Sequence, residues 1–192
     1  MKLTFREALR GYVAPSTDHA AGFAQGRLGG GALGFRALAT IDDLDAFETD
    51  PTHPVALEGA VDYAPLGRDL PLRGGVLNLL VPGGGGRRLR YRIPFEAEGR
   101  RFEIVGEKRI SRRSGFRDFT TLYVDLFEVH DASPAPEPLA RGRLHVPLAE
   151  ALRFPFGMRG PGRSGLAALV PVFRFLRFVR REIAAPLPIL PS

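Results

Sequence analysis

Hydrophobic and polar residues alternate along several segments of the chain, which is the pattern of a strand that buries one face. The alternation is clearest over residues 88–95, where every second residue is large and apolar and the residues between them include three arginines. Residues 101–109 follow after a turn at 98–100 and carry Glu103 and Glu107 on the face that meets those arginines. We therefore predict a β-hairpin whose register is supported by cross-strand ion pairs on its solvent side.

Strand-like segments recur along the chain, with glycine- and proline-rich turns between them. Their predicted ranges are 33–41, 55–63, 75–81, 88–95, 101–109, 119–129 and 140–146, and residues 2–12 fit either a strand or a helix. Regular spacing of this kind favours an antiparallel fold over parallel βαβ units. We therefore expect a mainly β protein, an antiparallel β-sandwich or barrel of about seven or eight strands with a C-terminal amphipathic helix.

Some segments between the strands have other patterns. Residues 15–31 are rich in glycine, alanine and small polar residues, from which we predict a loop. Asp42 resembles the N-cap of a helix of one or two turns, which Pro51 would end. The proline-rich residues 132–138 predict a further loop.

The last part of the chain has a helical pattern. It follows a glycine-rich joint at 157–165, in which Ser164 is suited to cap the helix. The apolar residues at three- and four-residue spacing are Leu166, Leu169, Val170, Phe173, Leu176, Val179 and Ile183, and the residues opposite are Arg174, Arg177 and Arg181. We therefore divide the chain into a β domain, residues 1–156, and a C-terminal helix with a proline-rich tail, residues 157–192, that packs on it.

Composition narrows the class of protein. The 192 residues are 44% hydrophobic and 25% charged, which is ordinary for a globular domain. The absence of cysteine excludes disulfides, thiolate metal sites and cysteine nucleophiles. The start of the chain lacks the apolar core of a secretory signal, and no apolar run has the length of a membrane-spanning helix. These features predict a cytoplasmic protein.

The formal net charge of +6 comes almost entirely from arginine, since Lys2 and Lys108 are the only lysines. Together with abundant alanine, glycine and proline, this is typical of a GC-rich coding bias. Alternation directs the aromatic residues of the basic strands away from the arginines, whereas proteins that bind single-stranded nucleic acid interleave both on one face. The sequence therefore disfavours nucleic acid as a partner.

The sequence matches known catalytic and ligand-binding motifs only weakly. Residues 29–34 match the glycine pattern of a dinucleotide-binding loop, but an alternating strand follows where that loop needs a helix. The acidic residues at 42–50 suit a first helical turn better than a calcium loop. The four histidines lie far apart, and no serine hydrolase elbow occurs. We therefore predict no cofactor and no metal site.

Several short motifs follow one another in a recognisable order. They are Phe5-x-Glu7-x-x-x-Gly11-Tyr12, Leu57-x-Gly59, Gly75-Val76-Leu77-Asn78-Leu79, Arg90-Tyr91-Arg92-Ile93, Gly99-Arg100, Gly106-x-Lys108 and Asp118-Phe119-Thr120-Thr121-Leu122-Tyr123. In this order they resemble an uncharacterised all-β accessory domain that accompanies cholesterol-oxidase-like GMC oxidoreductase and α/β-hydrolase modules in large bacterial proteins. The resemblance implies an accessory role in lipid or steroid metabolism. The flavin site and hydrolase triad of those modules are absent from this sequence, so neither activity is carried over.

Four polar residues lie beside predicted core strands and form a candidate polar cluster, namely Glu7, Lys108, Asp118 and Thr120. A buried charge needs a partner, so we expect Lys108 to pair with Glu7 or with Asp118. Structural pairing is the simplest interpretation, and a ligand-binding or catalytic role is the alternative.

Two classes of function are consistent with these features. The first is a non-catalytic binding or accessory protein for an apolar small molecule, a lipid or a lipid-metabolising enzyme. Its predicted pocket residues are Tyr91, Phe102, Tyr123 and Phe173. The second is an enzyme that acts on a lipid-like substrate through Glu7, Lys108 and Asp118. The broad apolar surface of the C-terminal helix could also dock a partner chain or contact a membrane peripherally.

Overall fold

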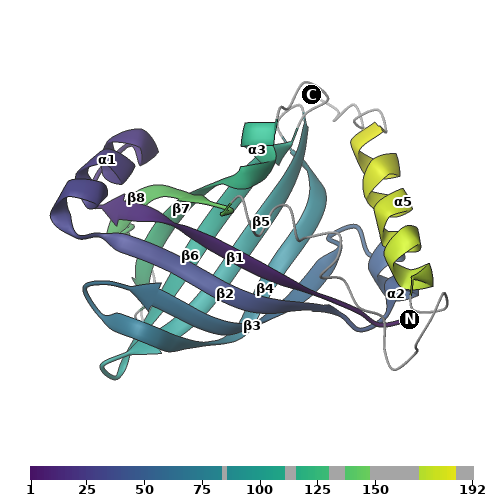
Figure 1. The fold of residues 1–192 in the computed structure, drawn as a ribbon, viewed down its shortest axis with the longest axis horizontal. Helices are drawn as coiled ribbons and strands as arrows, with labels where there is room; N and C mark the ends of the chain where they lie inside the picture. The colour runs from purple at the N-terminus through teal and green to yellow at the C-terminus, as the bar shows by residue number, and fades with distance from the viewer. Residues whose placement is uncertain (84–85, 111–115, 130–136, 148–168, 185–192) are drawn as a thin grey trace.

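The structure is a computed structural model that describes residues 1–83, 86–110, 116–129, 137–147 and 169–184. Within these residues, eight antiparallel strands form a closed barrel in chain order (Figure 1). The strands are β1 (Leu3–Ala14), β2 (Ala32–Ile41), β3 (Pro54–Tyr63), β4 (Gly67–Gly83), β5 (Gly86–Ala97), β6 (Arg100–Ile110), β7 (Thr121–Val129) and β8 (Ala140–His145). The predicted antiparallel β fold is confirmed, in its barrel form, and the ambiguous first segment is a strand.

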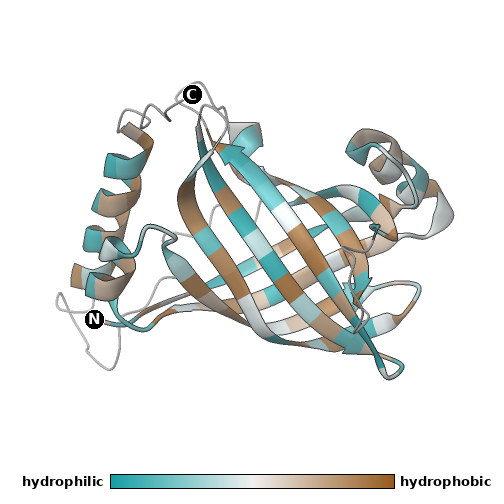
Figure 2. Ribbon diagram, turned by 180° about the vertical axis from the view of Figure 1, so that it is seen from behind, coloured by the Kyte–Doolittle hydropathy of each residue, from teal (hydrophilic) through white to brown (hydrophobic). Residues whose placement is uncertain are grey.

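Strand β1 closes the barrel by pairing on both sides. It pairs with β2 along its length and with β8 from Arg10, opposite His145, to Ala14, opposite Arg141. Alternate residues of each strand point inward, and the ribbon coloured by hydropathy shows the alternation from outside (Figure 2). The buried rows of β1 and β6 contain one charged residue each, Glu7 and Lys108. Two opposite charges therefore point into an otherwise apolar interior.

The predicted hairpin is confirmed as β5 and β6. Arg90 lies opposite Glu107, with 3.6 Å between Nε and the carboxylate, and Arg92 contacts Glu103 at 3.0 Å. Arg88 also pairs with Glu107. Cross-strand pairs at a sheet surface contribute about 0.2–1 kcal/mol each, so they support the register more than they stabilise the fold.

Residues predicted as a loop contain helix α1 (His19–Gly29), and this prediction was wrong. Asp18 caps the helix, since its carboxylate accepts from the amides of Ala20 and Ala21 at 2.8 Å. Gly30 ends it with a φ of +77°, the left-handed conformation that glycine adopts without strain.

Helix α1 packs against the barrel through its glycines. A Cβ atom at Gly22 would lie 2.1 Å from the carbonyl oxygen of Arg141, and one at Gly26 would lie 2.3 Å from that of Val13. The glycines that suggested a loop thus allow a helix to approach the backbones of β8 and β1.

One short helix differs from its prediction at its start, and a second was not predicted. Helix α2 (Leu44–Thr49) is capped by Asp43, one residue after the predicted Asp42, and ends before Pro51 as expected. Helix α3 (Phe116–Thr120) occupies the first residues of the predicted strand at 119–129, so β7 begins at Thr121.

Helix α5 (Val170–Ala184) packs beside α2 at the end of the barrel opposite to α1 (Figure 1). Its buried face contains Val172, Phe175 and Phe178. The predicted apolar stripe is wrong in its first half, since Val170 is 53% exposed and Phe173 is 65% exposed. The helix is amphipathic over Val170–Ala184, so its periodicity does indicate a buried side; the predicted stripe included Val170 and Phe173 where the structure buries Phe175 and Phe178. The predicted joint at 157–165, Leu166, most of the loop at 132–138 and the last eight residues of the tail lie outside the described residues.

Over the part of the chain that the structure describes, no helix is both long and apolar enough to cross a bilayer.

Candidate functional site

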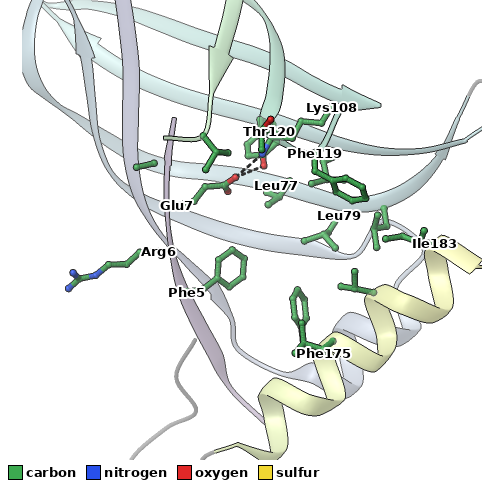
Figure 3. A pocket seen from close by; sticks show the side chains of 17 residues that line it. Phe5, Arg6, Glu7, Leu77, Leu79, Lys108, Phe119, Thr120, Phe175 and Ile183 are labelled. Carbon is green, nitrogen blue, oxygen red and sulfur yellow. Dashed lines mark hydrogen bonds and ion pairs between the residues drawn. The ribbon is translucent and has the colours of Figure 1, made fainter. Parts of the chain in front are cut away.

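A cavity of about 280 Å³ lies between the barrel interior and helix α5 (Figure 3). Most of its wall is apolar. The apolar lining residues are Phe5, Ala8, Leu77, Leu79, Leu80, Leu89, Phe119, Val146, Phe175, Leu176, Val179 and Ile183. Ligand pockets in proteins have this character, with a few polar groups that fix orientation.

An irregularity in β4 shapes one wall of the cavity. The pairing with β5 shifts register between Asn78 and Val81, and Leu80 has a φ of +57°. Such a bulge turns consecutive residues to the same side of a strand. Leu79 and Leu80 are both buried and both line the cavity.

The polar lining residues include three that meet across the barrel. The Glu7 carboxylate oxygen Oε1 accepts from Tyr91 Oη at 2.7 Å and from Lys108 Nζ at 3.1 Å. These side chains come from β1, β5 and β6, and Glu7 and Lys108 meet at the inner side of the cavity (Figure 3). The Lys108 side chain is 4% exposed and that of Glu7 is 10% exposed. The ion pair therefore lies in a region of low dielectric constant, where each charge needs the other.

The surroundings of Tyr91 keep its hydroxyl protonated. Burial, with a further contribution from the negative charge of Glu7, raises the pKa of Tyr91 well above its ordinary value of 10.0. Tyr91 therefore acts as a hydrogen-bond donor to Glu7. Lys108 Nζ also lies 5.2 Å from the centre of the Tyr91 ring, within range of a cation–π interaction.

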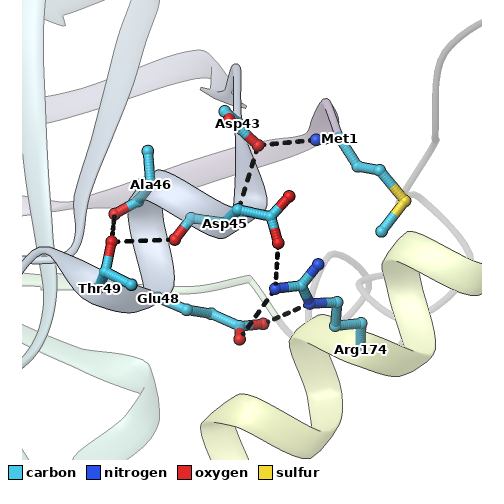
Figure 4. Close-up of polar contacts among 7 residues, drawn as sticks. All are labelled: Met1, Asp43, Asp45, Ala46, Glu48, Thr49 and Arg174. Atoms are coloured by element: carbon cyan, nitrogen blue, oxygen red, sulfur yellow. Dashed lines mark hydrogen bonds and ion pairs between the residues drawn. The ribbon is translucent and has the colours of Figure 1, made fainter.

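Helix α5 is held over the cavity by an ion pair near each end. Arg174 binds Glu48 at 2.8 Å and Asp45 at 2.7 Å, both on α2 (Figure 4). Hydrogen bonds to Glu48 and then to Asp45 raise the pKa of Arg174. Towards the other end, Glu182 pairs with Arg87 of β5 at 2.8 Å.

Between these ion pairs, α5 packs on an aromatic cluster. The Phe175 ring lies 6.0 Å from that of Phe5 and 6.1 Å from that of Phe47, and the Phe178 ring lies 4.8 Å from His53. His53 Nδ1 donates to the Leu79 carbonyl at 3.0 Å, since a carbonyl oxygen can only accept. Burial lowers the pKa of His53 below its ordinary value of 6.5.

The structure does not bring together the four residues predicted to line a pocket. Tyr91 lies on the cavity wall, whereas Phe102 lies in the core, stacked on Phe95 with 5.3 Å between ring centres. Tyr123 is on the outward face of β7 beside the guanidinium group of Arg143, 5.3 Å from its ring. Phe173 points to solvent.

The predicted polar cluster is brought together only in part. Glu7 and Lys108 form the expected pair, and Thr120 lines the same cavity. Asp118 is exposed on α3 and is not among the residues that line the cavity. The three groups of the catalytic hypothesis therefore do not converge.

Several lining residues were missed at the level of sequence. Phe5 stands two residues before Glu7, and the alternation within β1 would have assigned both to the interior had the segment been identified as a strand. Phe175 was missed because the predicted stripe passed through Phe173, although the periodicity of Val170–Ala184 favours the side of α5 that contains Phe175.

Among the described residues, no three histidine or acidic side chains are grouped as a metal site requires. Comparison with protein-family models, curated proteins and solved structures found no match.

Proposed function

We propose that this protein is a non-catalytic binding protein that holds an apolar small molecule inside the barrel, beneath helix α5. The observation that carries the proposal is the cavity of about 280 Å³ with its largely apolar wall and a small polar group at its inner side. Binding of an apolar molecule there is favoured by a free energy of about 25 cal/mol for each Å² of apolar surface removed from water.

Binding is better supported than catalysis by the arrangement of the charged groups. A catalytic acid or base must reach the substrate in a reactive protonation state. Here Lys108 and Glu7 neutralise each other, and Asp118 lies outside the cavity. The pair is suited to orient a ligand.

The resemblance seen in the sequence supports an accessory role beside enzymes of lipid or steroid metabolism. In this proposal the protein presents or stores an apolar compound for such an enzyme. Recovery of a lipid-metabolising enzyme with the ligand-free protein would instead favour a role in partner binding.

Peripheral membrane contact through α5 is a second proposal, supported by the outer face of that helix. Leu169, Val170 and Phe173 are exposed there, and Arg177 and Arg180 are exposed beside them. This combination is typical of helices that lie on anionic lipid surfaces. Phe173→Ser should reduce sedimentation with phosphatidylglycerol vesicles, and equal sedimentation of variant and wild type would contradict the proposal.

Native mass spectrometry before and after organic extraction tests the binding function first. The proposal predicts an adduct of lipid size that extraction removes. The extracted protein should then bind the neutral fluorescent probe N-phenyl-1-naphthylamine.

A pair of variants locates the binding site. Val146→Trp places a large ring at the cavity wall and should abolish most probe binding, whereas Val105→Trp is the matched control, because Val105 is 37% exposed on the outer face of β6. Equal probe binding by the two variants would contradict a site in the cavity.

A further inference from the structure

The two oxygens of the Glu7 carboxylate have different surroundings. Oε1 accepts two hydrogen bonds, from Tyr91 and Lys108, whereas Oε2 is buried and has no hydrogen-bond partner among the described residues. A buried carboxylate oxygen without a donor is unfavourable, so proteins usually provide one. The Glu7 side chain extends from β1 into the cavity, where a ligand could supply that donor (Figure 3).

Lys108 offers the complementary group. Its ammonium has three N–H donors, and within the described residues Glu7 receives one of them. The inner side of the cavity therefore presents an acceptor and a donor next to each other, with a net charge close to zero.

We propose, on the basis of the binding function above, that the ligand is an elongated apolar molecule that ends in a neutral hydroxyl group. The hydroxyl donates a hydrogen bond to Glu7 Oε2 and accepts one from Lys108 Nζ. A hydroxyl can do both at once, because it carries one donor and two acceptor lone pairs.

Charged end groups suit this site less well. A ligand carboxylate would be attracted by Lys108 but repelled by the negative charge of Glu7. A ligand ammonium would be attracted by Glu7 but repelled by Lys108. Both would also lose their hydration on entering a cavity with a largely apolar wall.

The apolar part of the ligand lies toward α5. The cavity on that side of the ion pair is lined by Phe5, Leu79, Phe175 and Ile183 (Figure 3), and Val179 of α5 is also a lining residue. The ligand is therefore oriented with its hydroxyl at the inner side of the cavity and its chain beneath the helix.

Competition with N-phenyl-1-naphthylamine on the extracted wild-type protein tests the proposal without any mutation. Decan-1-ol, decanoate and decylamine share one chain length and differ in the end group. We expect decan-1-ol to displace the probe at a concentration about tenfold lower than either charged compound. Equal or stronger displacement by decanoate or decylamine would overturn the proposal.

Glu7→Gln provides a second test. The amide oxygen can still accept hydrogen bonds from Tyr91 and Lys108, but the negative charge is lost. The affinity for decanoate should therefore rise by about tenfold relative to the affinity for decan-1-ol. Glu103→Gln is the matched control, since Glu103 pairs with Arg92 on the outer face of the barrel and should leave the order of the ligands unchanged. An unchanged order in folded Glu7→Gln would count against the assigned contact.

The outcomes separate this inference from the binding function itself. If the probe and all three compounds fail to bind, the binding function is wrong. If all of them bind with similar affinity, the cavity binds apolar molecules but the hydroxyl assignment is wrong.

Discussion

Lys108 and Glu7 form a buried ion pair inside the barrel, and the proposed ligand specificity also rests on this pair. Each side chain is at least nine-tenths buried, and they are 3.1 Å apart. Removal of one partner from a buried ion pair leaves the other charge uncompensated, which costs about 3–5 kcal/mol.

Lys108→Met should therefore lower the free energy of unfolding by about 3–5 kcal/mol, measured by urea denaturation. Addition of Glu7→Gln should recover part of this loss, because the uncompensated charge is then removed. A large loss of stability with unchanged binding of decan-1-ol would show that the pair is structural only and would contradict the proposed contact.

Burial of His53 should make the free energy of unfolding sensitive to acid, because it lowers the pKa of the imidazole. The native imidazole resists protonation, whereas the unfolded chain takes up the proton near the ordinary pKa of 6.5. Below that pH the unfolded state binds more protons, so the free energy of unfolding should fall as the pH is lowered from about 7 to about 5. His53→Asn should flatten this dependence, measured by urea denaturation at several pH values. An equally steep dependence in the variant would exclude His53 as its source.

At the scale of elements, α1 depends on glycine in a way that a sequence pattern cannot show. Gly26 is needed because the Val13 backbone lies where its Cβ would be, whereas a Cβ at Gly29 would meet nothing within 4 Å. Both look alike in the sequence, as glycines of a segment that resembles a loop.

Gly26→Ala and Gly29→Ala should therefore have opposite effects on stability, measured by urea denaturation. Gly26→Ala should destabilise the protein by about 1–3 kcal/mol, because the helix must move away from β1. Gly29→Ala should stabilise it by about 0.5–1 kcal/mol through helix propensity. Similar losses in both variants would show that α1 does not pack through Gly26.

The two ion pairs of α5 should contribute unequally to its attachment. The Arg174 side chain is 30% exposed, so Arg174→Gln should cost less than about 1 kcal/mol. The side chains of Arg87 and Glu182 are only 11% and 15% exposed. Arg87→Gln leaves the shielded carboxylate of Glu182 without its partner, which should lower the free energy of unfolding by about 2–3 kcal/mol. Hydrogen exchange of the α5 amides should accelerate more in Arg87→Gln. The reverse order would contradict this assignment.

The strands were predictable where local pattern and tertiary environment agree. In β5 and β6 the alternation gave the inward rows and the external ion pairs. The pairing of Lys108 followed from the cost of burying a charge, but the choice between Glu7 and Asp118 did not, since it depends on where α3 ends and β7 begins. The cavity was not predictable in its details, because it depends on where α5 lies over the end of the barrel and on the irregularity in β4 that turns Leu79 and Leu80 to the same side.

At the scale of the whole molecule, the barrel brings distant parts of the chain to one site. Glu7 and Lys108 are 101 residues apart, and α5 adds residues from near the C-terminus. Closure between β1 and β8 places both charges in one interior, which neither strand would create alone.

Helix α5 lies over the cavity, and this position has a consequence for the size of the proposed ligand. A molecule anchored by its hydroxyl at Glu7 and Lys108 extends its chain towards the helix. Each added methylene should strengthen binding by about 0.8 kcal/mol while it remains shielded from water. Once the tail reaches α5, further carbons must displace the helix or emerge into solvent. A homologous series of alcohols should therefore show affinity that rises with carbon number and then levels off, and the carbon number at the plateau would give the depth of the barrel interior in units of the ligand itself.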